Sequence, residues 1–179
     1  ANVAVFFFSS LFKTSTFAFF NPILPIGDGE YALNPYFKMW QPLTYMFMHG
    51  DMGHIFSNMF GLFMFGPALE MYMGPKRFLW YYVITGVGAA LLYSGLNTYE
   101  ASQYFVDSDP YNTIMFTPMV GASGAIFGLL AAFGILFPDV EMFLLFIPFP
   151  IKAKYFVILY GLYEIYAGTA GLNTGVAHF

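Results

Sequence analysis

The stretch Gly121-Ala122-Ser123-Gly124-Ala125-Ile126-Phe127-Gly128 places a lone serine among small residues at the start of an apolar run. The glycines at 124 and 128 form a small-xxx-small face, a pattern that in membrane helices usually serves close helix packing. A serine hydroxyl is a weak nucleophile unless a base lies beside it. The stretch therefore predicts either a packing face or one part of a reactive site, and the rest of the chain must decide between them.

The composition indicates an all-α polytopic membrane protein. Of the 179 residues, 59% are hydrophobic and only 9% are charged, against about 25% charged in a typical soluble domain. The net charge of −4, without a basic stripe, argues against a nucleic-acid partner. Because the chain has no cysteine, disulfides and thiolate chemistry are excluded. We also expect neither a cofactor nor a metal.

Turns and polar loops separate six apolar segments. They cover approximately residues 1–12, 43–69, 78–96, 123–137, 152–170 and the run that begins at Val176. The first and last are shorter than the ~20 residues that span a bilayer, so we expect both to be truncated parts of longer helices. The prediction is one domain, 1–179, with six transmembrane helices and a large aromatic-rich first loop, 13–42, in the membrane interface.

Basic residues in short connectors orient these helices. Lys76-Arg77 precede the third segment, and Lys152 and Lys154 precede the fifth, and short loops rich in Lys and Arg lie in the cytoplasm. The N-terminus is then cytoplasmic, and the second, fourth and sixth helices run from outside to inside. This orientation brings three polar clusters to one depth near the external face, namely His49/His54/Asn58, Ser123 and His178.

Because the three clusters lie at one depth, their side chains could act together in one reactive site. His178 lies on another helix at the level of Ser123 and can serve as its base, and Phe127, one turn beyond Ser123, can stack on its ring. We expect the sixth helix to pack on the small-residue face formed by Gly124 and Gly128. No acidic residue is placed to orient His178, so a dyad is predicted rather than a triad.

An oxyanion formed during acyl transfer needs hydrogen-bond donors. The first amides of a helix have no intrahelical partner, so those of Ala122 and Ser123 are available, next to the small Gly121. His54 and Asn58 are four residues apart and share one helix face. His49 lies about 140° around the same helix, and we expect it to face elsewhere and bond to the first loop.

In combination, three motifs resemble the signatures of the rhomboid family of intramembrane serine proteases. They are His49-x4-His54-x3-Asn58, Gly121-Ala122-Ser123-Gly124 and Gly175-Val176-Ala177-His178, in the family's order and on its second, fourth and sixth helices. The resemblance implies that Ser123 is the nucleophile and His178 the base. It also implies an oxyanion hole of His54, Asn58 and the Ser123 amide, with a contribution from Ala122.

Further positions extend the resemblance, and one departs from it. Phe127 matches the ring that stacks on the catalytic histidine, and Gly66 and Glu70 match a Gly-x3-Glu motif in which Glu70 is structural. Where many rhomboids carry Trp-Arg in the first loop, this chain has Trp40-Gln41. Since glutamine lacks the donor fork of a guanidinium, we expect different hydrogen bonding inside that loop.

The implied function is cleavage of the transmembrane segments of other proteins, near the outer face of the cell membrane. Substrates would unwind there, because a membrane helix shields its own carbonyls, and would enter past the fifth helix. On that helix Phe156, Tyr160 and Tyr163 could form a gate, or could simply pack in the core or against lipid.

Three alternatives stay open. The first is a non-catalytic rhomboid-like protein that binds transmembrane clients, although neither Ser123 nor His178 is missing. The second is a metal site of His49, His54 and His178, which the divergent helix faces of the first two disfavour. The third is a transporter. The candidate intramembrane acids are then only Glu70 and Glu164, which are few for an ion path.

Overall fold

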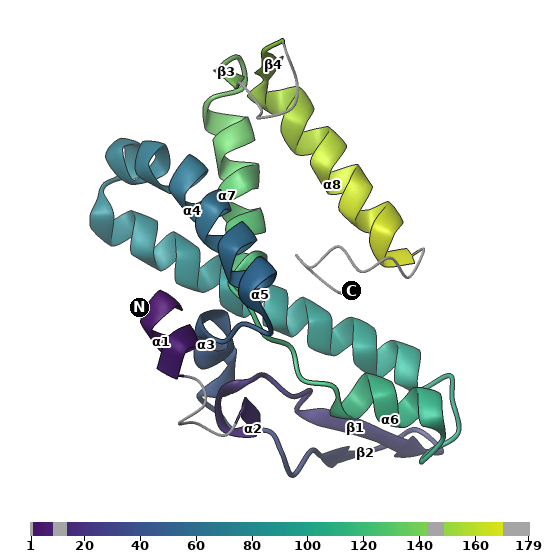
Figure 1. Ribbon diagram of the computed structural model, residues 1–179. Coiled ribbons are helices and arrows are strands. Elements are labelled where there is room, and N and C mark those ends of the chain that lie inside the picture. The colour runs from purple at the N-terminus through teal and green to yellow at the C-terminus, as the bar shows by residue number, and fades with distance from the viewer. Residues whose placement is uncertain (1, 9–13, 143–148, 170–179) are drawn as a thin grey trace.

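The computed structural model describes residues 2–8, 14–142 and 149–169, and most of them are helical (Figure 1). Four long helices dominate, namely α4 (Met52–Met73), α5 (Pro75–Ala101), α7 (Ser123–Leu136) and α8 (Ala153–Thr169). The shorter helices are α1 (Asn2–Phe8), α2 (Thr14–Phe17), α3 (Gln41–Thr44), the 3-10 turn η2 (Tyr45–Phe47) and α6 (Asp109–Phe116). Two antiparallel pairs complete the fold, β1 (Ile23–Gly27) with β2 (Glu30–Leu33), and β3 (Glu141–Met142) with β4 (Ile151–Lys152).

Helices α4 and α5 meet at a tight turn between the second and third apolar segments. Gly74 has a φ of +82°, a conformation that favours glycine, and Pro75 opens α5, where its missing N–H costs nothing. The predicted beginning of the second segment is wrong, because α3 and η2 occupy residues 41–47 and α4 begins only at Met52. Asp51 caps α4 by accepting a hydrogen bond of 2.8 Å from the His54 amide.

The polar stretch between the third and fourth apolar segments, residues 97–120, contains more helix than its composition suggests. Helix α5 continues through the polar residues to Ala101, and α6 occupies residues 109–116 inside the loop, with the Ser108 side chain as its N-cap. The polar side chains at the end of α5 face a buried network. Asn21 from the first loop accepts a hydrogen bond of 2.7 Å from Ser94 and donates one of 2.9 Å to Thr98.

The small-residue face of α7 packs against α5. A Cβ built on Gly124 would lie 2.5 Å from the Ala89 Cβ, and one on Gly128 would lie 2.5 Å from the Thr85 Cβ. Such close approach is what small-xxx-small faces permit. In the described residues the neighbour of this face is α5, and the sixth helix expected there lies outside them.

The first loop is closely bonded around Gln41, which is fully buried. Its Oε1 accepts hydrogen bonds from the Phe20 and Lys38 amides, and its Nε2 donates to the Ser15 and Tyr36 carbonyls. A glutamine amide thus joins four backbone groups, using two acceptor and two donor positions where a guanidinium offers donors only. That this bonding departs from the family's usual pattern stays a prediction.

The β1–β2 hairpin of this loop exposes apolar side chains, a surface that suits the membrane interface predicted for it. They belong to Ile23, Ile26, Tyr31 and Leu33.

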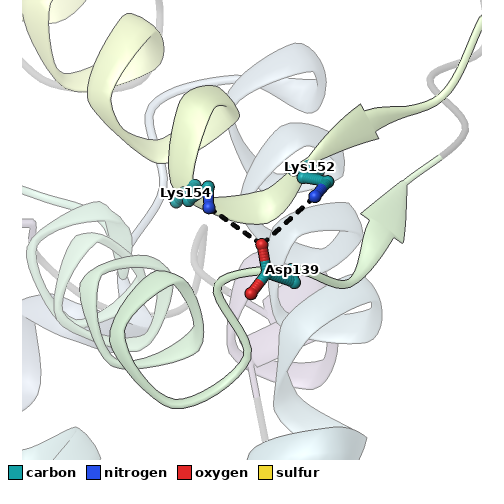
Figure 2. Close-up of polar contacts among 3 residues, drawn as sticks. All are labelled: Asp139, Lys152 and Lys154. Carbon is teal, nitrogen blue, oxygen red and sulfur yellow. Dashed lines mark hydrogen bonds and ion pairs between the residues drawn. The ribbon is translucent and has the colours of Figure 1, made fainter.

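The connector between α7 and α8 pairs β3 with β4, and Asp139 adds two ion pairs beside them (Figure 2). Its carboxylate lies 2.8 Å from the Lys154 ammonium and 3.3 Å from that of Lys152. These two hydrogen bonds, Lys154 first, lower the pKa of the Asp139 carboxyl. Since all three side chains are exposed, the pairs contribute little stability.

Within the described segments, α5 is the helix both long and apolar enough to cross a membrane. Few residues of this helix are buried, as expected of a helix that faces lipid rather than a soluble core. Large exposed apolar side chains continue along α4 and α5 and include Phe56, Phe63, Met71, Leu79, Trp80, Ile84 and Leu91. The predicted sixth helix lies outside the described residues, so the count of six spans stays a prediction.

Candidate active site

Ser123 is the first residue of α7 and is buried, with 3% of its surface exposed. Ala122, fully buried, is the N-cap. The preceding amide, that of Gly121, donates a hydrogen bond of 3.0 Å to the Tyr45 carbonyl. Across the described part of the chain, the amides of Ala122 and Ser123 have no acceptor, as expected at the start of a helix.

His54 lies directly against the segment that leads into Ser123. A Cβ built on Gly121 would overlap the His54 ring, and the φ of +113° at Gly121 also favours glycine. The glycine is thus required both by the backbone conformation and by the neighbouring ring. The structure thus brings His54 against the beginning of the fourth apolar segment, whereas the shared membrane depth expected for the two stays a prediction.

Asn58 lies one turn beyond His54 on α4, with 2% of its surface exposed. Its Nδ2 donates a hydrogen bond of 2.9 Å to the His54 carbonyl. An amide nitrogen has two hydrogens, so one remains for a ligand. Its Oδ1 is buried and has no partner in the described ranges.

His49 is placed differently from the prediction. Because α4 begins at Met52, His49 is not on the helix, and its ring lies edge-on to that of His54 with centroids 5.2 Å apart. Its Nδ1 lies 3.3 Å from the Phe47 carbonyl rather than bonding to loop 13–42. Burial, together with the charge of nearby His54, lowers the pKa of His49 to about 4, so the ring is neutral at neutral pH.

The three residues predicted to form a gate on α8 differ in their contacts with other aromatic rings. Phe127 of α7 stacks on Tyr160 with centroids 5.6 Å apart, and Tyr160 stacks on Phe156 at 5.8 Å. Phe156 in turn stacks on Phe65 of α4 at 6.2 Å, so a ladder of rings joins three helices. Tyr163 is half exposed and has no ring partner among the residues described.

Two other predicted residues have no assigned contact. His178 lies outside the described residues, so neither its distance to Ser123 nor its stacking on Phe127 is described. The Glu70 side chain is exposed near the end of α4, and within residues 2–8, 14–142 and 149–169 its carboxylate has no partner. In the same ranges, no group of three or more His, Asp or Glu side chains could hold a metal ion.

One residue of the site could not be predicted from the sequence. Tyr45 is fully buried and contacts both Gly121 and Gly124. It lies in the apolar run that opens the second segment, where a tyrosine carries no signal beyond packing. Only the 3-10 turn η2 brings it next to α7.

Comparisons with known proteins agree with the motifs. A family model described as "Rhomboid domain" matches residues 36–179. The chain is 32% identical over 131 residues to rhomboid protease AarA of Providencia stuartii, covering 73% of this chain and 46% of that protein. It is also 32% identical over 143 residues to the mitochondrial RHOMBOID-like protein 12 of Arabidopsis thaliana. That match covers 76% of this chain and 41% of that protein.

A third relative is rhomboid protease GluP of Bacillus subtilis, 32% identical over 110 residues, or 62% of this chain and 18% of that protein. The chain thus spans less than half the length of these relatives. No solved structure matches it significantly.

Proposed function

This chain belongs to the rhomboid family, and from that premise we propose that it is an intramembrane serine endopeptidase with a Ser123–His178 dyad. The observation that carries the proposal is the contact between His54 and Gly121. It supports the proposal because the imidazole lies against the residue two before a buried serine, and the amides of Ala122 and Ser123 have no acceptor in the described chain.

The proposed reaction follows acyl transfer. The Ser123 Oγ attacks the scissile carbonyl carbon while His178 takes the hydroxyl proton. The negative charge on the former carbonyl oxygen is stabilised by the amides of Ala122 and Ser123 and by the His54 and Asn58 side chains. His178 then gives its proton to the leaving amine, and a water molecule, activated by the same base, hydrolyses the acyl-enzyme.

The proposed substrates are transmembrane segments of other proteins in the lipid bilayer, cut near the outer face. A helix in lipid satisfies its own backbone, so segments that unwind near that face would be preferred. Entry would pass α8, where the stack of Phe127, Tyr160 and Phe156 would have to open. The protein would be a multi-pass cell-membrane protein with a cytoplasmic N-terminus and an extracytoplasmic active site.

The test is cleavage of a transmembrane substrate by protein reconstituted in liposomes. The wild type and a Ser102→Ala control, which changes an exposed serine on the 97–120 segment, should both cleave. Ser123→Ala and His178→Ala should not. Cleavage that survives Ser123→Ala would overturn the nucleophile, and loss of activity on addition of a chelator would indicate a metal site. Client binding without cleavage by the wild type would favour the non-catalytic alternative.

A further inference from the structure

Tyr45 joins the segment that carries the proposed nucleophile to the rest of the fold. It has 0% of its surface exposed and lies in η2. Its carbonyl accepts the Gly121 N–H at 3.0 Å. The backbone two residues before Ser123 is therefore fixed to Tyr45.

The side chain of Tyr45 is fixed at its other end. Its hydroxyl donates a hydrogen bond of 2.7 Å to the Gly86 carbonyl of α5. The same oxygen lies 3.2 Å from where a Cβ of Gly124 would be. The hydroxyl therefore lies between α5 and α7 and contacts α7 at Gly124, the residue after Ser123.

A second contact supports the same segment from the first loop. Phe19 packs its ring against that of Tyr45, with centroids 6.1 Å apart. Its backbone forms a bridge to Met119, with hydrogen bonds of 2.9 Å and 2.8 Å. Residues 119 and 121 are therefore held by two residues that also contact each other.

We propose that Tyr45 is a positioning residue for the oxyanion donors, an inference that rests on the function proposed above. Because the Gly121 amide is bonded to Tyr45, it is not available to substrate, and the amides of Ala122 and Ser123 are the donors left. Such donors act only when they lie 2.7–3.1 Å from the developing oxyanion, and a misplacement of about 1 Å can cost a hundredfold in rate. The Tyr45 hydroxyl limits how far this segment can move.

The test is Tyr45→Phe, which removes the hydroxyl and keeps the ring. The matched control is Tyr81→Phe, which removes another tyrosine hydroxyl bonded to a helix carbonyl, that of Gly128, at 2.9 Å. Measured as kcat and KM on a transmembrane substrate, Tyr45→Phe should lower kcat roughly five- to tenfold with KM unchanged. Tyr81→Phe should leave kcat within about twofold of wild type.

The outcomes separate this inference from the proposed function. If the wild type cleaves and Tyr45→Phe has an unchanged kcat, the positioning role alone is overturned. It is also overturned if Tyr45→Phe and Tyr81→Phe lose kcat equally. A wild type that neither cleaves nor reacts with a serine-directed probe would overturn the proposed function itself. If Tyr45→Phe does not fold, Phe19→Leu, which keeps the Met119 bridge but loosens the ring contact, should lower kcat in the same way, and an unchanged kcat there would overturn the inference.

Discussion

The His54 ring lies against Gly121, so closely that a Cβ on the glycine would overlap the imidazole. This contact joins the beginning of α4 to the beginning of α7, two segments more than sixty residues apart in the chain. The His54 ring thus lies against the residue two before Ser123, and among the described residues the amides of Ala122 and Ser123 have no acceptor.

Gly121→Ala should abolish most activity and destabilise the fold. A residue other than glycine at a φ of +113° costs about 1–3 kcal/mol, and the new methyl group must also displace His54. Gly88→Ala on α5 is the matched control, because a Cβ there has no neighbour within 4 Å in the part of the chain that the structure describes. Thermal unfolding in detergent and serine-probe labelling would both be measured; equal behaviour of the two variants would contradict the close contact.

Gly128→Ala should loosen the packing of α7 on α5. Its Cβ would lie 2.5 Å from the Thr85 Cβ, and overpacking of this kind typically costs about 1–3 kcal/mol. The control is Gly161→Ala on α8, where a Cβ has no neighbour within 4 Å among the described residues. We expect the melting temperature to fall for Gly128→Ala only. An unchanged melting temperature of this variant would contradict the close packing of α5 on this face.

The stability of the protein should depend on His49 between about pH 6.5 and pH 4. The pKa of His49 is lowered in the folded protein to about 4, so in this window the unfolded chain binds a proton that the folded chain does not. The free energy of unfolding should therefore decrease as the pH falls through the window, by up to roughly 3 kcal/mol. His49→Gln should flatten the slope; a variant with the wild-type slope would show that His49 is not the group responsible.

The ring stack on α8 should restrict substrate entry. Tyr160→Ala removes the contact to Phe127 and should raise the rate for a membrane-embedded substrate more than for a soluble peptide. Tyr163→Ala should have a smaller effect, because that side chain is already half exposed. Leu162→Ala, an exposed change on the same helix, is the control. Equal acceleration on both substrates would exclude a gate.

Features set by local chemistry could be predicted from the sequence. Gly74-Pro75 ends one helix and begins the next because glycine accepts a positive φ and proline suits a helix start. Ser123 begins α7, and the i, i+4 spacing puts His54 and Asn58 on one face of α4.

Features that depend on tertiary packing could not be predicted. The face of Gly124 and Gly128 shows that some helix approaches, but not that it is α5. The angle assigned to His49 assumed a helix that had not yet begun, although Asp51, a residue type preferred at N-caps, marks the true beginning of α4. The role of Tyr45 depends on a hydrogen bond to Gly86, forty-one residues away.

The central claim is that Ser123 is the nucleophile, and the most direct measurement is the location of a covalent probe. The purified protein would be treated in detergent with a fluorophosphonate, digested, and analysed by mass spectrometry to find the modified residue. We predict one adduct, on Ser123, that is lost in His178→Ala because the serine then lacks its base. An adduct on another residue, or labelling that persists in Ser123→Ala, would contradict the account.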